Sequence, residues 1–384
     1  NYNNSTVANI PIEALSSKAP VYDRKWKKIK LPNKKISIKN LKKINFEDAL
    51  IKILSSSNQS NKNWITEQYD QMVMCDTVQR SGANSAIIRI HKKNKGIALS
   101  VDSSANYCKS HPLTGGKQVV CENWRNLISV GSTPVAITNC LNFGNPNDPG
   151  VYWQFKNAVT GIGDACRKLG TPVTGGNVSF YNETKDFAVY PSPVIGMVGE
   201  IEDINNHTTM DFKDSGDFIL LLGSLSGSLG GSEYLKTIHG KIEGPIANYD
   251  IDYEIAVQEL CLNLINKGIV KSAHDMSEGG LSVNIAESIL HSKDNSLGAK
   301  LNIESKLRLD ELLFGECQSV IIITINQKDL ITVITEAKKL SVHTQTIGRV
   351  TNDKTLSINN SISLDRDRLG NGYFNYYSNL LSEQ

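Results

Sequence analysis

A chain of 384 residues with 40% apolar composition can bury sizeable cores, and the usual sizes of domains favour two domains over one. The formal net charge of +2 says little about partners. No apolar run approaches the length of a membrane span and no signal-peptide pattern opens the chain, so we expect no membrane partner.

Residues 1–43 have the character of a linker. The chain begins with Asn1 rather than Met and residues 2–18 look like an internal segment, so we expect a fragment or a processed piece of a longer protein. A basic run follows with almost no aromatic residues for base stacking, which favours a solvated linker over a nucleic-acid-binding arm. The basic residues of this run are Arg24, Lys25, Lys27, Lys28, Lys30, Lys34, Lys35, Lys39, Lys42 and Lys43.

The next part of the chain alternates helical and strand-like segments. Apolar residues at helical spacing predict helices at 46–54, 117–130 and 152–169, and the last of these stops at Gly170 as a helix C-terminus should. The predicted strands are 86–90, 97–101, which delivers Asp102 at its end, 135–138, and the run entering Gly175; a Gly/Asn/Pro loop spans 142–150.

A polar stretch at 201–217 separates a second unit, so we place the domain boundary near residue 210. We assign 1–43 to a linker, 44–210 to an α/β domain and 211–384 to an α+β domain. The predicted elements of the second unit are a strand at 218–222, a Gly/Ser loop at 223–231, a short helix around Tyr234, helices at 253–267 and 278–291 on either side of a strand ending at Asp275, a strand at 319–325, a helix at 327–340 and a strand at 344–350.

The cysteines are odd in number and scattered, with no C-x-x-C pair and no histidine at metal-ligand spacing. We expect them to be reduced and mostly packed thiols of a cytoplasmic protein. They are Cys75, Cys108, Cys121, Cys140, Cys166, Cys261 and Cys317.

Residues 171–183 carry the first candidate site. Paired glycines, Gly175 and Gly176, let backbone N–H groups approach an anion, and Asn177 and Ser179 offer oxygen atoms without added charge. The segment therefore predicts a loop that binds phosphate or a metal ion. A tight turn in which Asn and Ser cap the loop is the plainer alternative.

Three further sets of residues offer oxygen ligands, and the first is on a predicted helix. Glu122 and Asn126 lie four residues apart on one helical face, after a Gly115-Gly116 pair that could form an anion-binding helix start. The alternative is a surface Glu beside an Asn.

At residues 274–281, a strand ends in Asp275 and Ser277 precedes a helix that opens with Gly279 and Gly280. The plainer interpretation is an N-cap at Ser277 and Glu278, with glycines that only permit close helix packing. Two glycines in a first turn cost about 1 kcal/mol each, however, which a close approach to a bound group would justify.

A third set, Glu316 and Gln318, lies before a buried strand and is interpreted as ordinary strand alternation. The sequence shows no complete Ser/His/Asp or Cys/His nucleophile arrangement. It has no Walker A pattern and no G-x-G-x-x-G pattern after a strand. A chain of this kind that binds ATP would need a different type of phosphate-binding site.

Taken in order, the motifs resemble the formylglycinamidine ribonucleotide synthetase (phosphoribosylformylglycinamidine synthase) family, specifically the second half of its large synthetase subunit. The Leu-Asn-Phe-Gly-Asn-Pro and Gly-Gly-Asn-Val-Ser-Phe-Tyr-Asn segments are the most specific. The matching segments lie at residues 8–11, 19–22, 69–73, 112–117, 140–146, 171–183, 229–234 and 274–281.

The resemblance implies the two-domain fold of the aminoimidazole ribonucleotide synthetase superfamily, with an N-terminal sheet domain that pairs with a sister domain. It also implies a reaction in which ATP activates the formyl amide oxygen of formylglycinamide ribonucleotide, and ammonia from a glutaminase displaces phosphate. ATP and Mg²⁺ are the expected cofactors, because Mg²⁺ offsets charge on the transferring phosphoryl group.

The expected partners are the first half of the synthetase, in the same or another polypeptide, and a glutaminase with a small bridging subunit or a fused glutaminase domain. Because the family's catalytic histidine and principal substrate contacts lie in the first half, we assign no catalytic residue here and expect the chain alone to be inactive. A nucleic-acid partner is not expected.

The resemblance also implies site residues. Gly176 matches a nucleotide contact, Asn177 a Mg²⁺ ligand and Ser179 a substrate contact. Asn139 stands where the family usually has an Asp that contacts ATP. In single-chain relatives a structural nucleotide with Mg²⁺ is held at positions that match Glu122, Asn126, Asp275 and Ser277. Other departures from the family pattern are Asn84, Asn106, His111 and Cys317.

Two alternatives remain open. One is a superfamily relative such as thiamine-monophosphate kinase or selenophosphate synthetase, which would need an Asp-rich metal site; the candidates are scattered, such as Asp76, Asp102 and Asp275. The other is a non-catalytic scaffold half that holds a structural nucleotide, which the loss of charge at several family positions makes plausible.

Overall fold

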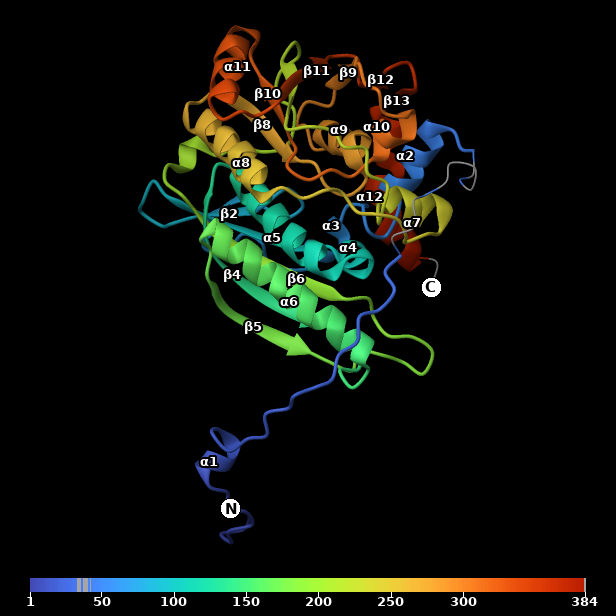
Figure 1. The fold of residues 1–384 in the computed structure, drawn as a ribbon. Coiled ribbons are helices and arrows are strands. Elements are labelled where there is room, and N and C mark those ends of the chain that lie inside the picture. The colour runs from blue at the N-terminus through green and yellow to red at the C-terminus, as the bar shows by residue number, and fades with distance from the viewer. Residues whose placement is uncertain (33–35, 37–40, 42, 383–384) are drawn as a thin grey trace.

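The computed structural model describes residues 1–32, 36, 41 and 43–382, and it contains two β-sheets with helices packed against them (Figure 1). Four basic residues of the predicted linker, Lys34, Lys35, Lys39 and Lys42, lie outside the described residues. The layered α/β and α+β architecture expected from the alternating elements is confirmed.

The first sheet has six strands in the order β1-β2-β3-β6-β4-β5. All neighbours are antiparallel except β4 and β5, which are parallel. The strands are β1 (Thr77–Gln79), β2 (Ala86–Arg89), β3 (Gly96–Ser103), β4 (Thr133–Asn142), β5 (Val173–Ser179) and β6 (Ser192–Ile201).

Helices α5 (Pro112–Ile128) and α6 (Pro149–Leu169) lie side by side over one face of this sheet (Figure 1). Val119, Ile162 and Ile195 are among the residues of the core between them. The opposite face, called here the open face, carries exposed apolar side chains. Its exposed apolar residues are Ile88, Ile97, Leu99, Val101 and Val198, and Val101 is 74% exposed.

The second sheet has seven strands in the order β13-β12-β9-β11-β7-β10-β8. Only the β12–β9 pair is parallel. The strands are β7 (Phe218–Leu222), β8 (Val270–Asp275), β9 (Gly298–Leu301), β10 (Ile321–Ile325), β11 (Thr344–Thr351), β12 (Thr355–Ile358) and β13 (Ile362–Asp365).

Helices cover both faces of the second sheet. Strands β7 and β10 are therefore fully buried, and they are apolar except for Thr324. On one face lie α8 (Ile251–Asn266) and α11 (Leu330–Lys339). On the other face lie α2 (Phe46–Leu54), α7 (Glu233–His239), α9 (Gly280–Leu290), α10 (Leu309–Phe314) and α12 (Arg366–Ser382).

Helix α2 packs into the core of the second sheet through Leu50, Ile53 and Leu54, although its place in the sequence put it in the first domain. Its apolar residues recur at helical spacing, and this pattern carries no information about which sheet the helix will cover. The remaining helices are α1 (Ile12–Leu15), α3 (Asn63–Thr66), α4 (Ala105–Ser110) and the 3₁₀ turns Val73–Cys75, Ile204–Asn206 and Gln327–Asp329.

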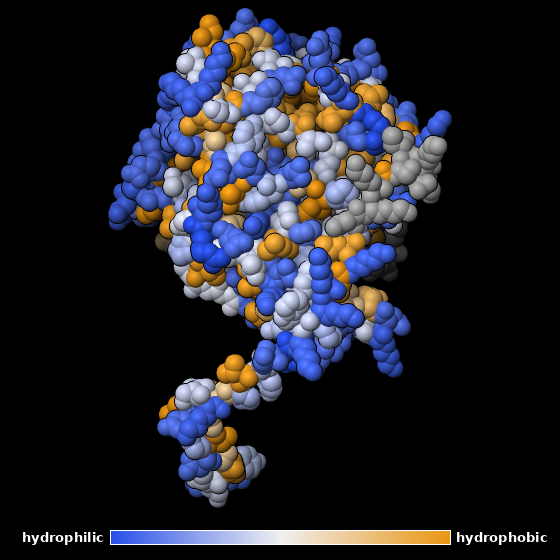
Figure 2. Space-filling model, viewed as in Figure 1, coloured by the Kyte–Doolittle hydropathy of each residue, from blue (hydrophilic) through white to orange (hydrophobic). Residues whose placement is uncertain are grey.

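The N-terminal arm, residues 1–23, stands away from the body and exposes apolar residues such as Val21 (Figure 2). Beyond it the chain meets the start of α6, where the Lys27 N–H donates to the Pro149 carbonyl at 2.9 Å and Trp26 lies 4.7 Å from the Lys156 ammonium.

All seven cysteines are free thiols and five of them are buried, as expected. Within the described ranges, no helix is long and apolar enough to cross a membrane.

Candidate functional site

The predicted site residues fall into two separate groups. One group lies where the two sheets' layers meet, and we call its four carboxylates, Asp102, Glu122, Asp275 and Glu278, the interdomain acidic cluster. The other group lies on two adjacent strands at the edge of the first sheet, and we call Asn139, Gly176, Asn177 and Ser179 the β4–β5 edge.

Helix α5 brings Glu122, Arg125 and Asn126 to the acidic cluster. It begins at Pro112, with the His111 ring accepting from the Thr114 N–H at 3.3 Å, so Gly115 and Gly116 lie inside the helix. The predicted anion-binding start at these glycines is therefore wrong. A Cβ on Gly116 would lie 2.4 Å from the Ala158 carbonyl oxygen of α6, so this glycine permits close helix packing.

The plainer interpretation of Glu122 as a surface residue is also wrong, because it is 1% exposed. Its carboxylate lies 3.5 Å from the Ser104 hydroxyl, and the Asn126 amide lies 3.5 Å from the Asp102 carboxylate. Glu122 and Asn126 thus share one buried corner with the strand end at Asp102, while Asp275 enters from β8 of the other sheet.

Arg125 is the cation of this buried corner, and the sequence reasoning missed it. Its guanidinium is fully buried, bonds Asp275 through Nε, and donates through Nη1 to Glu254 at 2.8 Å and to Gln318 at 3.2 Å. Gln318 is thus part of the network, beyond the strand alternation first assigned to it. An Arg three residues after Glu122 on an amphipathic helix gave no sign of burial, since charged residues are usually exposed.

One guanidinium does not balance the carboxylates around it. Burial raises the pKa of Asp102, Glu122 and Glu278 well above the usual range, and neighbouring carboxylates raise each further. Burial also raises the pKa of Asp275, although Arg125 opposes the rise. The cluster therefore favours added positive charge.

Oxygen ligands and excess negative charge suit Mg²⁺. The Asp275 Oδ2 atom is buried without a hydrogen-bond partner, which leaves one oxygen for a cation. Among the described residues, no three His, Cys, Asp or Glu side chains already stand at metal-ligand geometry, so water or a phosphate would have to complete the coordination. Asp102 and Glu278 also line a cavity of about 300 Å³, together with Lys62, Glu287 and Tyr373 among others.

Ser277 lies just before α9 and does not cap it. The N-cap is Gly279, with φ of +81° and no side-chain cap, and Gly280 also has a positive φ. A Cβ on Gly280 would lie 2.7 Å from the Gly315 carbonyl oxygen. A Cβ on Gly279 would lie 2.4 Å from the Val283 side chain, so both glycines permit close packing within the protein, which agrees with the packing alternative. The capping role predicted for Ser277 is wrong.

The β4–β5 edge is a strand pair where a loop was predicted. Residues 173–179 form β5, which pairs in parallel with β4 in the register Asn139 to Gly176 and Cys140 to Asn177. The glycines were interpreted as loop-forming, but in an edge strand they leave room for a neighbour. A Cβ on Gly176 would lie 2.4 Å from the Asn139 Oδ1 atom, so the Asn139 side chain covers Gly176.

The edge residues divide between the two faces of the first sheet. Asn139 pairs with the buried Ile195 of β6, which places Asn139 and Gly176 on the helix-covered side. Asn177 and Ser179 alternate with Gly176 and so belong to the open face. The Ser179 hydroxyl donates to the Asn182 Oδ1 atom at 3.1 Å, while the exposed Asn177 amide approaches only the Cys140 sulfur, at 3.9 Å.

Comparison with protein families matches both units. The family described as AIR synthase related protein, N-terminal domain, matches residues 82–201, and the C-terminal domain of the same family matches residues 214–359. Among curated proteins, the phosphoribosylformylglycinamidine synthase subunit PurL of Pelagibacter ubique (strain HTCC1062) is 42% identical over 381 residues, which are 99% of this chain and 52% of that protein.

Solved structures share the fold at low identity. T. maritima PurL complexed with FGAR superposes with a TM-score of 0.70 at 15% identity, over 86% of this chain and 54% of that one. T. maritima PurL complexed with ATP gives 0.58 at 21% identity, over 91% and 48%. PurLQS from Thermotoga maritima gives 0.59 at 18% identity, over 72% and 45%.

The chain spans about half the length of the curated relatives that it matches. Its two units follow one another as the two family domains do. The alignment with PurL covers 99% of this chain and 52% of that protein. This chain belongs to the AIR synthase related family and is homologous to about half of the phosphoribosylformylglycinamidine synthase subunit PurL.

Proposed function

We propose that this chain is the C-terminal half of the large subunit of an ATP-dependent ligase that makes formylglycinamidine ribonucleotide from formylglycinamide ribonucleotide and glutamine-derived ammonia. The observation that carries the proposal is the 42% identity to PurL over 99% of the chain. The FGAR and ATP complexes of T. maritima PurL name the substrate and the nucleotide that we assign to the complete protein.

The open face of the first sheet is the proposed contact with the other half of the synthetase. Monomeric proteins rarely expose a continuous apolar sheet face, and here Leu99 and Val101 of β3 lie beside Val198 of β6. Asn177 and Ser179 belong to the same face. A sister sheet packed there would bury the apolar residues and would bring its own side chains to the β4–β5 edge.

At that edge we assign the nucleotide contacts to Asn139 and Gly176, a Mg²⁺ contact to Asn177 and a substrate contact to Ser179. Mg²⁺ bound with ATP would offset charge on the phosphoryl group. The chain's own part is to present uncharged oxygen and N–H groups on a rigid strand pair, where they orient a ligand without repelling its phosphates. The catalytic groups would come from the other half, so the chain alone is proposed to be inactive.

In the acidic cluster we assign Mg²⁺ ligands to Glu122, Asn126 and Asp275, and a nucleotide contact to Ser277. The free Asp275 oxygen and the uncompensated negative charge support this second site. Both of its sides come from this chain, so it would bind Mg-nucleotide without a partner. The PurLQS assembly of T. maritima supports a glutaminase and a small subunit as further partners of the complete protein.

The ligase proposal is tested by reconstitution. We expect the chain mixed with the upstream half of its own synthetase to form amidine with ammonia and ATP, and the chain alone to form none. Product is measured with ammonium chloride in place of glutamine, so that no glutaminase is needed. Failure of the properly folded mixture to make any product would refute the proposal.

Calorimetry with Mg-ATP separates the two sites. We expect Asp275→Ala to abolish binding by the isolated chain, and Asn177→Ala to leave it unchanged because the β4–β5 edge awaits its partner. Retained activity of the reconstituted enzyme with Asn177→Ala would favour the second candidate, a scaffold half, which the uncharged Asn139 at the edge supports.

A further inference from the structure

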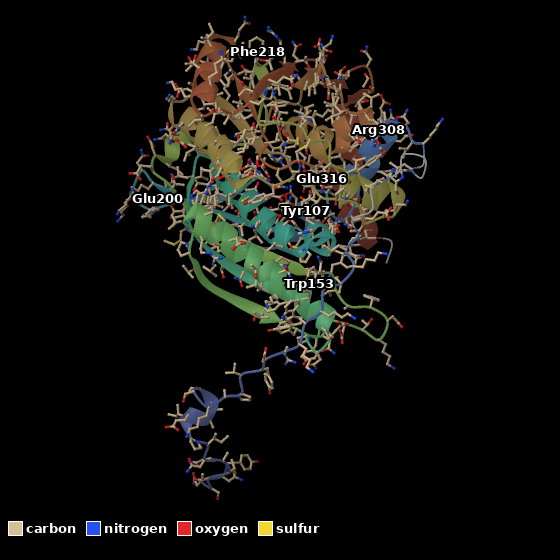
Figure 3. The ribbon with its side chains drawn as sticks, viewed as in Figure 1. Tyr107, Trp153, Glu200, Phe218, Arg308 and Glu316 are labelled. Carbon is tan, nitrogen blue, oxygen red and sulfur yellow. The ribbon has the colours of Figure 1, made fainter. Side chains whose placement is uncertain are left out.

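Glu316 joins the two layers at the acidic cluster. It lies between α10 and β10 and is 2% exposed. Its Oε1 atom accepts from the Gly279 N–H at 2.8 Å and from the Glu233 N–H at 2.7 Å, and its Oε2 atom accepts from the Tyr107 hydroxyl. Figure 3 places Glu316 and Tyr107 close together at the junction of the two layers.

These three donors come from three elements. Gly279 is the N-cap of α9 and Glu233 is the first residue of α7, both packed against the second sheet. Tyr107 belongs to α4, which follows the first sheet's β3 and its Asp102. One carboxylate therefore fixes two helix starts of one layer and a helix of the other layer.

A carboxylate satisfies all three donors at this position. Two backbone N–H groups aim at one oxygen and the Tyr107 hydroxyl aims at the other, and a carboxylate accepts on both oxygens. Helix N-termini also favour negative charge. Burial raises the pKa of Glu316 to about 7, while the bonds from Tyr107, Gly279 and Glu233 oppose the rise.

The backbone around Glu316 leaves little room for movement. A Cβ on Gly315 would lie 2.6 Å from the Gly227 Cα atom, and a Cβ on Gly280 would lie 2.7 Å from the Gly315 carbonyl oxygen. The Glu316 N–H donates to the Ser228 carbonyl at 2.8 Å. The Glu316 carboxylate is thus held in a fixed position, and it restrains the three groups that donate to it.

The groups that bond to Glu316 border the proposed nucleotide site. Residues 275–279 run from the Asp275 carboxylate through Ser277 and Glu278 to the amide that Glu316 holds. On the other side, Tyr107 follows Ser104, whose hydroxyl contacts Glu122. We call residues 275–279 and residues 104–107 the two walls of the acidic cluster. Each wall therefore ends, within a few residues, at a bond to Glu316.

We propose that Glu316 is a positioning residue, which sets the spacing between the residue 275–279 segment and α4 so that both walls of the acidic cluster can hold one Mg-nucleotide. The inference rests on the nucleotide site proposed above. It assigns the Tyr107 hydroxyl, and not the capping of helices α7 and α9, as the link between the walls.

Tyr107→Phe tests that link, because it removes the bond between the layers and leaves both N–H bonds to Glu316 in place. Tyr249→Phe is the matched control, since it also removes a hydroxyl at the junction of the two units, one that lies 2.9 Å from the Cys121 sulfur and does not touch Glu316. Glu316→Ala removes the link and both helix-start bonds together.

The readouts are calorimetry with Mg-ATP on the 384-residue chain and amide hydrogen exchange without ligand. We expect Tyr107→Phe to raise the Kd by about tenfold, the size of one charge-assisted hydrogen bond, while Gly279 and Glu233 stay protected from exchange. Glu316→Ala should raise the Kd at least as much and should expose both amides. Tyr249→Phe should change neither.

Equal affinity in the parent chain, Tyr107→Phe and Glu316→Ala would overturn the inference and leave Glu316 a helix cap. An equal loss of affinity in Tyr249→Phe would also overturn it, since any weakening of the junction would then suffice. A parent chain that binds no Mg-ATP would overturn the nucleotide site, and this inference with it, which is a different result from binding that the variants leave unchanged.

Discussion

The interdomain acidic cluster and the β4–β5 edge are built in opposite ways. The cluster is charged, with Glu122 and Asp275 buried and Asp102 and Glu278 partly exposed. Its side chains come from β3, α5, β8 and the segment before α9, near the guanidinium of Arg125. The edge is exposed and uncharged, and two neighbouring strands carry all of it. Buried carboxylates need partners within the chain, because desolvated charge is costly, whereas exposed neutral groups can wait for a partner chain.

At the edge, a substitution can change ligand binding without changing the stability of the fold. In the cluster, a substitution changes both. Replacing Asn177 at the edge removes an exposed amide whose contact with the Cys140 sulfur is weak, so the folded chain loses little. A substitution in the cluster changes both the ligand contacts and the balance of buried charge. The same ligand-removing change should therefore have very different effects on folding in the two regions.

The largest effect is expected for Arg125→Met. The substitution leaves Asp275 and Glu254 buried without their cation, so we expect a loss of about 3–5 kcal/mol in the free energy of unfolding at neutral pH. Denaturant unfolding measures it. The contrasting variant is Asn177→Ala at the edge, for which we expect a change below about 0.5 kcal/mol.

A triple variant provides the control. Arg125→Met combined with Asp275→Asn and Glu254→Gln removes the unpaired charges, and it should recover much of the lost stability because neutral groups are cheaper to bury. A small effect of Arg125→Met alone would contradict the comparison, since the buried carboxylates of Asp275 and Glu254 would then not depend on their cation.

Two adjacent glycines sharpen the description of the edge. A Cβ on Gly176 would lie 2.4 Å from the Asn139 side chain and 2.8 Å from the Asn139 carbonyl oxygen, whereas a Cβ on Gly175 would meet only the Thr138 hydroxyl, at 4.0 Å. We expect Gly176→Ala to destabilise the chain by about 1–3 kcal/mol and Gly175→Ala to be neutral or slightly stabilising. Thermal unfolding of the two variants checks this, and equal effects would show that the register of β4 and β5 differs from the one described.

Much of the fold was predictable because regular periodicity marks most of its helices and strands. Helix α6, the start of β3 and strand β7 lie close to their predicted positions. Strand β6, at the centre of the first sheet, was not predicted, because Pro193, Gly196 and Gly199 interrupt its apolar run. A Cβ on Gly199 would lie 2.2 Å from the Ser132 hydroxyl, so close packing between strands requires the glycine that hid the strand.

The site was predictable only as a set of residues. Motif order indicated Glu122, Asn126 and Asp275, and the structure brings Glu122 and Asn126 to the corner that Asp275 enters. Arg125 and Glu316 were not singled out for a site role, because their importance arises from burial between elements far apart in the sequence. Gly279 and Gly280 were noticed for the right physical reason, close approach. The approaching group is the Val283 side chain at Gly279 and the backbone of Phe314 and Gly315 at Gly280.

The smallest effect concerns His111, which caps the helix that carries Glu122 and Arg125 into the cluster. Its Nδ1 atom must be unprotonated to accept from the Thr114 N–H, and burial lowers the pKa of His111 below its ordinary value of 6.5. A lowered pKa means that the folded chain binds fewer protons than the unfolded chain. The stabilisation is therefore present above pH 6.5 and is lost as the pH falls below it.

We expect the loss of the cap to amount to about 1 kcal/mol between pH 7.5 and pH 5. Because many carboxylates also titrate, the informative quantity is the difference in unfolding free energy between the parent chain and His111→Asn, whose amide caps a helix without titrating. That difference should shift by about 1 kcal/mol in favour of the Asn variant at low pH. A constant difference would mean that α5 holds its buried residues in place without the His111 cap, and the cluster would then depend on its internal charges alone.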